Sequence, residues 1–317
     1  MSMTLMEYAK TAFNGGEVKR ASVISQFARA SAWLAALPFQ NIQGGAYTYD
    51  IEGALPGIAF RGINESFTAS TGLINPQAEA LRIGGGDLDV DVALVKMYGP
   101  DRRAQEEVMK IKALAAEVTR VLIKGSSTTE PREFDGLQAR LVVGGNQVVS
   151  AGTTDAGDAM SLYKLDTMIS RVAGPNKRLW MNRTMQLRLS AAARLATVGG
   201  YINWSPDDFG RQVMSYNGIP VDVPYPENDG TEPLAFDEQG DIEGTPAGTT
   251  STSIYCVSLG DGYVRGIQNG AMDVRDLGEI NTSPVYRTRV EWLVSLCLEN
   301  PKAAARLGGI SNAAVVA

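Results

Sequence analysis

The chain has 317 residues, of which 44% are hydrophobic and 20% charged, enough for one large domain or two smaller ones with a packed core. Its formal net charge is −6 and it has no long basic run, unlike proteins that grip nucleic acid through phosphates. It contains no histidine, which excludes Ser-His-Asp, Cys-His and histidine-based zinc chemistry.

The two cysteines, Cys256 and Cys297, each lie in an apolar, strand-like segment. We expect buried, reduced thiols rather than a disulfide, and no nucleophile, because no histidine is present to activate a thiol. No apolar stretch is long enough to cross a bilayer, and the N-terminus has no basic region followed by an apolar core. We therefore expect no membrane partner and a soluble chain made in the cytoplasm.

Two helices are predicted at the start of the chain, over residues 4–13 and 17–37. Thr4 and Glu7 have the spacing of a capping box, and Pro38 ends the second helix. Apolar residues recur every three or four positions in that helix. Residues 1–38 thus form an arm that is apolar on one side and needs a surface to cover, in its own chain or in a neighbour. Phe27 and Trp33 are its candidate interface residues.

Residues 39–98 have a different character, rich in Gly, Thr, Asn and Ser, with short β segments at 46–49 and 58–60. We interpret them as a long two-stranded loop that projects from the body. Such a hairpin is marginally stable alone, so it also needs a partner surface. Phe60 is a candidate interface residue, whereas Tyr47 and Tyr49 either anchor an interface or pack the hairpin.

The loop ends in a strictly alternating strand that carries Asp87, Asp89 and Asp91 on one face. Three carboxylates on one face suggest either a divalent metal site, a solvated face, or an interface with a basic neighbour. The preceding Gly84, Gly85 and Gly86 lack the Gly-Lys-Ser/Thr of a phosphate-binding loop, and no helix follows them. We therefore predict a bend or hinge at these glycines.

The clearest helix is predicted over residues 100–124, a rod of roughly 37 Å with one apolar stripe. Its stripe residues are Ala104, Val108, Ile111, Ala115, Val118 and Leu122. Further helices are predicted over 158–172 and 183–195, the second capped by Asn182 after a strand at 177–181. Asn217-Gly218 predicts a type I′ hairpin turn.

Residues 227–253 are Gly/Thr/Asp-rich and predict a mobile surface loop. Strands are predicted at 253–259, 262–267, 272–276 and 286–299, and the alanine-rich tail after Pro301 is expected to add little. Helices and strands mix without regular βαβ alternation, so the fold class is α+β rather than a doubly wound sheet.

The order of these parts resembles the major capsid protein of tailed bacteriophages, the Hong Kong 97-type coat fold, which encapsulin shells share. The resemblance rests on the 100–124 helix, the Glu133–Leu137 passage that follows it, the strand–Asn182–helix element and the Asn217-Gly218 hairpin. It implies an N-terminal arm at 1–38, an extended loop at 39–98 and a peripheral domain at 99–138 and 266–317. The 100–124 helix would be the spine helix of that domain, and the axial domain would span 139–265.

The resemblance also implies a function: a non-catalytic coat protein that self-assembles through pentamers and hexamers into an icosahedral shell around a double-stranded DNA genome. Implied partners are a portal protein, a separate scaffolding protein or none, a decoration protein, and the packaged DNA, held weakly and non-specifically. No cofactor is implied. The chain would belong to the virion and assemble in the host bacterial cytoplasm.

Two alternatives stay open at this point. An encapsulin-type nanocompartment shell would hold cargo enzyme instead of a genome. A metal-dependent enzyme would use the carboxylates of Asp87, Asp89 and Asp91. Some family members crosslink a loop lysine to a neighbour, but this chain has no lysine between Arg20 and Val95. We therefore expect a shell without such covalent links.

Overall fold

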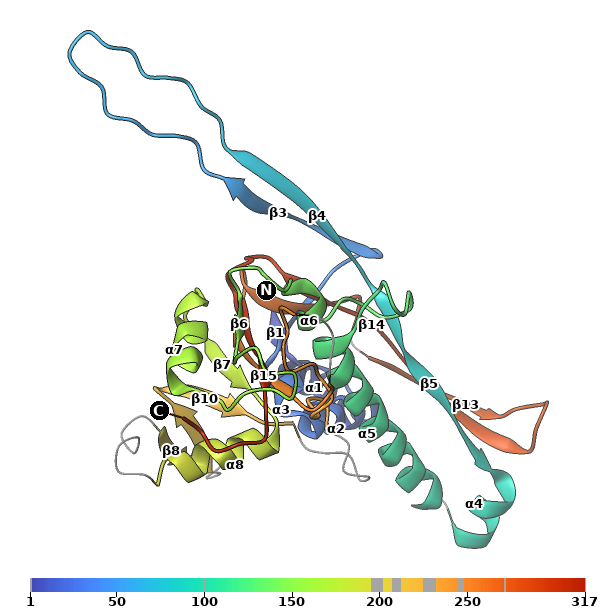
Figure 1. Cartoon of the computed structure of the whole chain (residues 1–317). Helices are drawn as coiled ribbons and strands as arrows, with labels where there is room; N and C mark the ends of the chain where they lie inside the picture. The colour runs from blue at the N-terminus through green and yellow to red at the C-terminus, as the bar shows by residue number, and fades with distance from the viewer. Residues whose placement is uncertain are drawn as a thin grey trace.

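The computed structural model describes residues 2–99, 101–194, 202–206, 212–224, 232–244, 248–270 and 272–316. Within these ranges, two β-sheets and their helices form one body, and a long hairpin projects from it (Figure 1). Helix α5 (Asp101–Lys124) runs along the body; Pro100, its predicted first residue, lies outside the described residues. No helix in the described ranges is long and apolar enough to cross a bilayer.

The first sheet contains six strands among the described residues, and the long strand β14 organises it. The first half of β14 lies between β13 and β5, and its second half pairs with β12. The strands are β1 (Met3–Thr4), β2 (Pro38–Asn41), β5 (Arg82–Asp91), β12 (Val264–Gln268), β13 (Asp273–Glu279) and β14 (Val285–Leu298). Because β5 and β14 pair antiparallel over ten positions, the segment that follows the hairpin is held firmly on the body.

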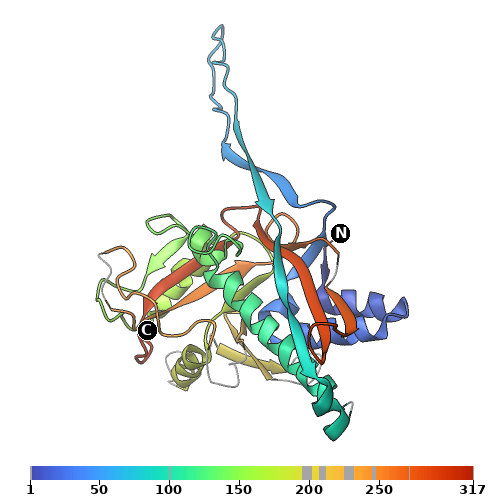
Figure 2. The ribbon, with the colours of Figure 1, turned by 90° about the vertical axis from the view of Figure 1, so that its right-hand side faces the viewer.

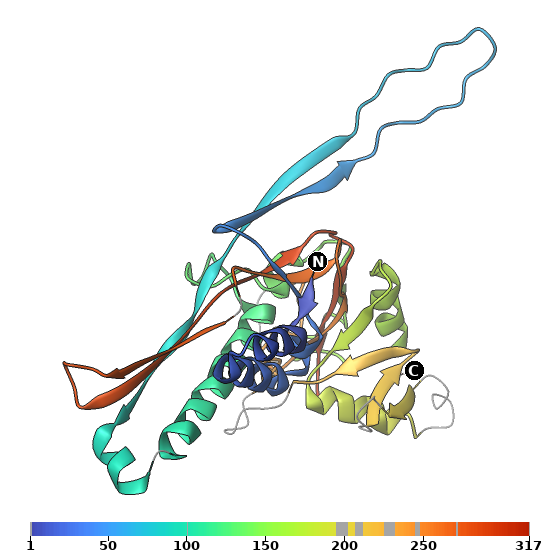
Figure 3. The same cartoon turned by 180° about the vertical axis from the view of Figure 1, so that it is seen from behind.

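The N-terminal helices α1 (Leu5–Asn14), α2 (Val18–Ala30) and α3 (Ala32–Ala36) pack beside α5, as the rear view shows (Figure 3). The predicted capping box is confirmed, since the Thr4 and Glu7 side chains each accept from the other residue's backbone N–H. The helix predicted over 17–37 is instead broken at Ser31, which has extended backbone angles and separates α2 from α3.

The second sheet contains seven strands among the described residues, in the order β6-β15-β11-β7-β10-β9-β8. Helices α7 (Leu162–Arg171) and α8 (Arg183–Ala192) bury their apolar residues in its core. Short α6 (Leu137–Arg140) follows α5. The strands are β6 (Val148–Ser150), β7 (Lys177–Trp180), β8 (Ile202–Pro206), β9 (Gln212–Tyr216), β10 (Ile219–Asp222), β11 (Thr252–Ser258) and β15 (Ala304–Ile310).

Two local predictions in this sheet are confirmed. The Asn182 side chain accepts from the backbone N–H of Met185 at 2.7 Å and caps α8. Asn217 and Gly218 connect β9 and β10 with φ values of 49° and 76°, the left-handed conformation that a type I′ turn requires. Helix α8 was predicted to reach Leu195, which lies outside the described residues.

The tail after Pro301 was wrongly expected to add little. Its residues Ala304–Ile310 form β15, which is buried throughout and lies between β6 and β11 in the seven-stranded sheet. The predicted boundary placed all of residues 266–317 in one domain. Because β15 belongs to the seven-stranded sheet, these residues do not all lie with the six-stranded sheet. The other domain boundaries stay predictions.

Candidate assembly surface

A hairpin of β3 (Ala46–Ala54) and β4 (Leu73–Ala80) stands clear of the body, and residues 55–72 form its tip (Figure 1 and Figure 2). Its strands pair antiparallel from Ala46↔Ala80 to Ala54↔Leu73. The projecting two-stranded loop was predicted from the sequence. The short strand predicted at 58–60 is absent from the tip, because no segment among the described residues lies beside it to pair with it.

The tip carries several large apolar side chains, and none of the described residues covers them. Phe60 is fully exposed, and Ile58 and Ile63 are 93% and 95% exposed. Residues of the tip also contact one another, since Arg61 lies over the Phe67 ring with 5.3 Å to its centroid. Arg61 also donates to the Glu65 carbonyl oxygen at 3.0 Å. Exposed apolar surface of this kind is typical of contact sites between molecules, and an interface role for Phe60 stays a prediction.

The base of the hairpin is fixed to the body by two polar clusters. In the first, the Tyr47 hydroxyl donates to Glu299 at 2.9 Å and accepts from Arg265 at 2.6 Å. In the second, the Tyr49 hydroxyl donates to Glu79 at 3.2 Å, while Arg140 donates to the other oxygen of Glu79 at 2.8 Å.

The two tyrosine rings stack with centroids 5.9 Å apart, and burial raises the pKa of both hydroxyls. Both therefore stay protonated at neutral pH. Of the two roles left open for Tyr47 and Tyr49, the structure shows the one that packs the hairpin. An interface role for these two residues stays a prediction.

The acidic strand faces arginines of its own chain. Asp87 is paired with Arg289 at 2.6 Å, and Asp89 with Arg287 at 2.6 Å. These hydrogen bonds are the largest cause that lowers the pKa of each carboxyl group. Asp91 instead caps helix α4 (Val92–Tyr98), accepting from the Ala93 N–H at 2.7 Å.

The basic groups that face Asp87 and Asp89 are thus arginines of β14 in the same chain, and an interface role for the three aspartates stays a prediction. The structure does not bring the three aspartates together as ligands. No group of three or more His, Cys, Asp or Glu residues in the described part of the chain is placed to hold a metal ion.

The glycines predicted as a hinge lie instead inside strand β5. Gly84, Gly85 and Gly86 pair with Trp292, Glu291 and Val290 of β14. A Cβ at Gly85 would overlap the Val290 carbonyl oxygen, and a Cβ at Gly86 would lie 3.1 Å from Cε of Lys110. The glycines at 85 and 86 permit close approach of neighbouring groups, and the ladder around all three holds the chain straight.

Phe27 and Trp33, predicted at an interface, are both completely buried in the chain's own core. The Phe27 ring meets Trp292 of β14 edge-on at 5.2 Å. Trp33 stacks on Trp180 of β7 at 5.1 Å and donates to the Asp222 carbonyl oxygen at 3.1 Å. The apolar side of the arm thus covers the body of its own chain. Neither residue is available to a neighbour.

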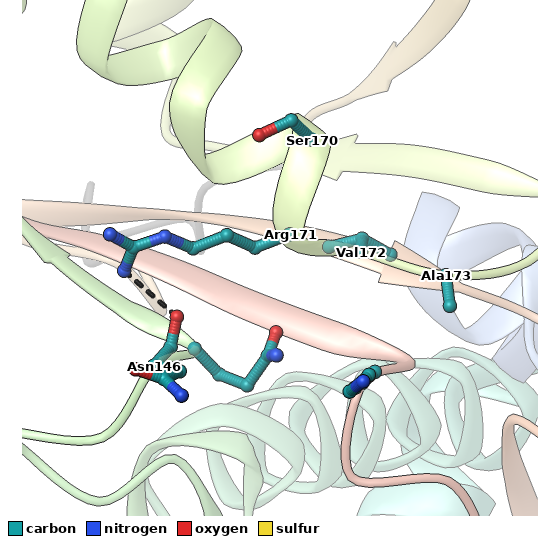
Figure 4. A pocket seen from close by; sticks show the side chains of 7 residues that line it. Asn146, Ser170, Arg171, Val172 and Ala173 are labelled. Atoms are coloured by element: carbon teal, nitrogen blue, oxygen red, sulfur yellow. Dashed lines mark hydrogen bonds between the residues drawn. The ribbon is translucent and has the colours of Figure 1, made fainter. Parts of the chain in front are cut away.

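A shallow hollow of about 430 Å³ lies beside the end of α7 (Figure 4). Arg171 at its edge donates to the carbonyl oxygens of Asn146 and Val148, at 2.8 and 2.9 Å. The remaining lining side chains come from Gln147, Ser170, Val172, Ala173 and Lys302. The seven lining residues include no carboxylate and no thiol, so they supply neither a nucleophile of that kind nor a carboxylate base.

Cys256 and Cys297 are buried free thiols, as expected. Burial is the main cause that raises the pKa of each to about 12. Neither forms the thiolate that nucleophilic chemistry or metal binding requires at neutral pH.

Sequence reasoning found the projecting loop but missed most of the residues that define the surface. The exposed tip residues Leu55, Ile58, Ile63 and Phe67 have no periodicity, and only their apolar character within a Gly/Pro/Ser-rich stretch could have drawn notice. The partners that fix the hairpin base, Glu79, Arg140, Arg265 and Glu299, lie far apart along the chain and leave no local signal.

The chain is similar to a capsid protein family and to solved structures of capsids and an encapsulin. Residues 17–166 match the family described as Major capsid protein GP7. The fold is similar to the SrpI encapsulin complex of Synechococcus elongatus PCC 7942, with a TM-score of 0.62 and 17% identity over 90% of this chain and 89% of that one. It is also similar to a structure of Microbacterium phage Oxtober96, with a TM-score of 0.62 and 12% identity over 89% and 91%.

The capsid of a native GTA particle is a further neighbour, with a TM-score of 0.59 and 13% identity over 86% of this chain and 88% of that one. No curated protein sequence matches the chain. The chain therefore has the capsid fold that phage coats and encapsulins share, and the resemblance stated from the sequence is confirmed.

Proposed function

We propose that the chain is a major capsid protein that self-assembles into the icosahedral head shell of a tailed phage and encloses its double-stranded DNA. The family match over residues 17–166 and the capsid fold together support a coat protein. The structural observation that carries the proposal is the projecting hairpin with its uncovered apolar tip.

The physical argument for assembly is that a single chain cannot bury this tip. The tip stands away from the body in every view, so only another molecule can cover it (Figure 2). A closed symmetric arrangement of pentamers and hexamers covers the tip of every copy with one repeated contact. Each contact is modest, but every subunit makes several, so the shell as a whole is strongly held.

The role proposed is structural, not catalytic. The carboxylates of Asp87 and Asp89 are neutralised by Arg289 and Arg287, which disfavours the alternative of a metal-dependent enzyme. That alternative is tested by Asp89→Asn, which would abolish metal-dependent activity but only perturb the β5–β14 pairing in a coat protein.

We propose a portal protein, a scaffolding protein and a decoration protein as further partners, and host cytoplasm as the place of assembly. The formal charge of −6 suits an inner wall on which packaged DNA slides without tight binding. The shell would be non-covalent, since no lysine occurs between Arg20 and Val95 to crosslink the loop. Intersubunit bonds that survive boiling in SDS would contradict this.

The proposed function is tested by negative-stain electron microscopy of the purified full chain. Closed shells, tubes or rings of five or six subunits are expected. A uniform monomer of 33.9 kDa under every condition would refute the proposal.

A matched pair of variants sharpens the test. Ile58→Ser with Phe60→Ser removes apolar surface from the tip, whereas Phe13→Ser does so on α1, where the side chain is 62% exposed. All three side chains are largely exposed, so both variants should fold as the unaltered chain does. Assembly should fall for the tip variant alone.

An encapsulin-type shell is the second candidate, favoured by the similarity to the SrpI encapsulin complex. The two candidates differ in what the shell contains and in the neighbouring genes. Genes for a terminase and a portal beside this one indicate a phage head, and a gene for a cargo enzyme indicates a nanocompartment.

A further inference from the structure

The hollow beside the end of α7 is lined by cations and by no acid. Its volume of about 430 Å³ lies within the range of small-ligand sites, roughly 300–1,000 Å³. Two of its lining residues, Arg171 and Lys302, are positively charged at neutral pH, and the others are neutral. In a chain with a formal net charge of −6, a concave surface that carries only cations is suited to attract an anion.

Neither cation is neutralised within the part of the chain that the structure describes, where Arg171 and Lys302 form no ion pair. The acid nearest to Arg171 along the chain is Asp166, which accepts from a tyrosine hydroxyl at 2.8 Å. Asp166 also lies about 140° around the helix axis from Arg171, at 3.6 residues per turn. The acid nearest to Lys302 is Glu299, which is paired with Arg265. Both charges of the hollow are therefore available to a ligand.

The guanidinium group of Arg171 is fixed before any ligand binds. Its Nη1 donates to the carbonyl oxygens of Asn146 and Val148, at 2.8 and 2.9 Å (Figure 4). Nε and Nη2 have no hydrogen-bond partner among the described residues. Since an arginine has five N–H donors in one rigid plane, three of them remain for an added acceptor. Binding costs this side chain little conformational entropy, because two hydrogen bonds already order it.

Lys302 is held at the hollow by a tight turn. Its backbone N–H donates to the Asn300 side-chain oxygen at 2.9 Å, and its carbonyl oxygen accepts from the Ala173 N–H at 2.8 Å. These bonds fix the backbone of Lys302 against the segment that follows α7. Its ammonium group is exposed and has no hydrogen-bond partner in the described ranges. The hollow thus combines a rigid guanidinium group with an ammonium group that can turn toward a ligand.

The negative end of the α7 dipole is offset at this position. The last carbonyl groups of a helix together carry about half a negative charge, which would repel an anion. The Ile169 carbonyl oxygen, in the last turn of α7, accepts from Nζ of Lys177 and from the Val172 N–H, both at 3.2 Å. Lys177 is a third cation without an ion pair among the described residues. Its charge opposes the partial charge of the helix end and leaves the hollow favourable to anions.

We propose that this hollow binds a compact oxyanion of the phosphate type, either inorganic phosphate or the phosphate group of a small phosphomonoester. The planar N–H donors of Arg171 bind its oxygens, and Lys302 supplies the second positive charge. Two cations without an acid favour a phosphate group, which carries a charge of about −1.5 to −2 at neutral pH, over a singly charged carboxylate. A concave hollow of this size suits a compact group better than the convex backbone of a DNA duplex. The site lies within one chain and does not depend on shell formation.

Titration of the purified full-length chain with inorganic phosphate and with glycerol phosphate tests the site. Binding is followed by phosphorus NMR at constant ionic strength, with chloride as the balancing ion. We expect saturable binding that Lys302→Gln weakens at least about tenfold, because a hydrogen bond to a charged group is lost. Lys302→Arg keeps the charge and should bind within about threefold of the unaltered chain. The matched control is Lys112→Gln on α5, an exposed lysine that makes no ion pair among the described residues, and it should leave binding unchanged.

Arg171→Gln should remove binding altogether. Because Arg171 also covers two carbonyl oxygens of its own chain, the Tm of this variant is measured beside its binding. Lys302→Gln removes no printed contact of the fold, so it decides the matter if Arg171→Gln proves unstable.

Two results would overturn the inference. The first is phosphate binding that does not saturate, or that is equally strong in Lys302→Gln and Lys112→Gln. The second is a DNA duplex that binds through Lys302 and is not displaced by inorganic phosphate, because the ligand would then be a nucleic-acid backbone. Neither result bears on the proposed coat function, which the assembly experiment tests separately.

Discussion

Replacing Arg140 by methionine should loosen the attachment of the hairpin to the body. Arg140 donates to Glu79 at 2.8 Å, to the Leu296 carbonyl oxygen at 2.9 Å and to the Asp135 carbonyl oxygen at 2.9 Å. The side chains of Arg140 and Glu79 are only 12% and 18% exposed. Methionine keeps the aliphatic length but leaves the Glu79 carboxylate almost unsolvated and without its cation.

The cost follows from that burial. Removing one partner of a fully buried pair costs about 3–5 kcal/mol, and this pair keeps some exposure, so we expect a loss of about 2–3 kcal/mol. At about 2.1 cal/mol/K of unfolding entropy per residue, 1 kcal/mol shifts the Tm of a chain this long by about 1.5 °C. The expected fall in Tm is therefore about 3–5 °C for the unassembled protein.

A double-mutant cycle with Glu79→Gln identifies the pair as the cause. Neutralising Glu79 in the Arg140→Met background should restore about 1.5–2 kcal/mol, and backbone amides of β3 and β4 should exchange faster in the single variant. Lys10→Met on α1 is the control, since its exposed side chain makes no ion pair among the described residues. Strictly additive effects, or unchanged exchange in β3 and β4, would refute the reasoning.

Three further outcomes are expected. Gly85→Ala should cost about 1–3 kcal/mol, because its Cβ overlaps the Val290 carbonyl oxygen, whereas Gly84→Ala meets nothing nearer than 3.9 Å and should be nearly neutral; equal Tm changes would contradict this. The lowered pKa of Asp89 means that its pairing with Arg287 stabilises the fold above the unfolded-state pKa of about 3.9 and is lost as the pH falls through the lower folded value. The Tm difference between the unaltered chain and Asp89→Asn should thus stay constant from about pH 8 to 5 and shrink as the pH falls below about 3.9, and a difference that already shrinks between pH 8 and 5 would oppose it. Iodoacetamide at about pH 8 should leave both buried thiols unmodified in the native chain and alkylate both in denaturant, as mass spectrometry can show.

Much of the fold was predictable because its signals are local. The capping box at Thr4, the cap at Asn182 and the Asn217-Gly218 turn each depend on residues within three positions of one another. The stripe of α5 and the alternation of β5 are likewise visible within one window of sequence. The hairpin was predictable from composition, because residues 39–98 are rich in Gly, Thr, Asn and Ser and contain short β segments.

The errors arose where a residue's role depends on a distant partner. Periodicity shows that Phe27 lies on an apolar face, but not that Trp292 of the same chain covers that face. Gly85 has the composition of a hinge, and only the Val290 carbonyl opposite it explains why a glycine stands there. Strand β15 is buried on both faces and made largely of Ala and Gly, so it has neither alternation nor bulk to reveal it.

Strand β5 links the projecting hairpin mechanically to the opposite end of the body (Figure 1). One residue separates it from the hairpin strand β4, and its ten residues run directly into α4. The projecting hairpin and helix α4 thus lie at the two ends of strand β5, which pairs with β14 along its whole length. In the proposed shell, a load on the hairpin would pass along β5 and, through its pairing with β14, into the body of the same subunit.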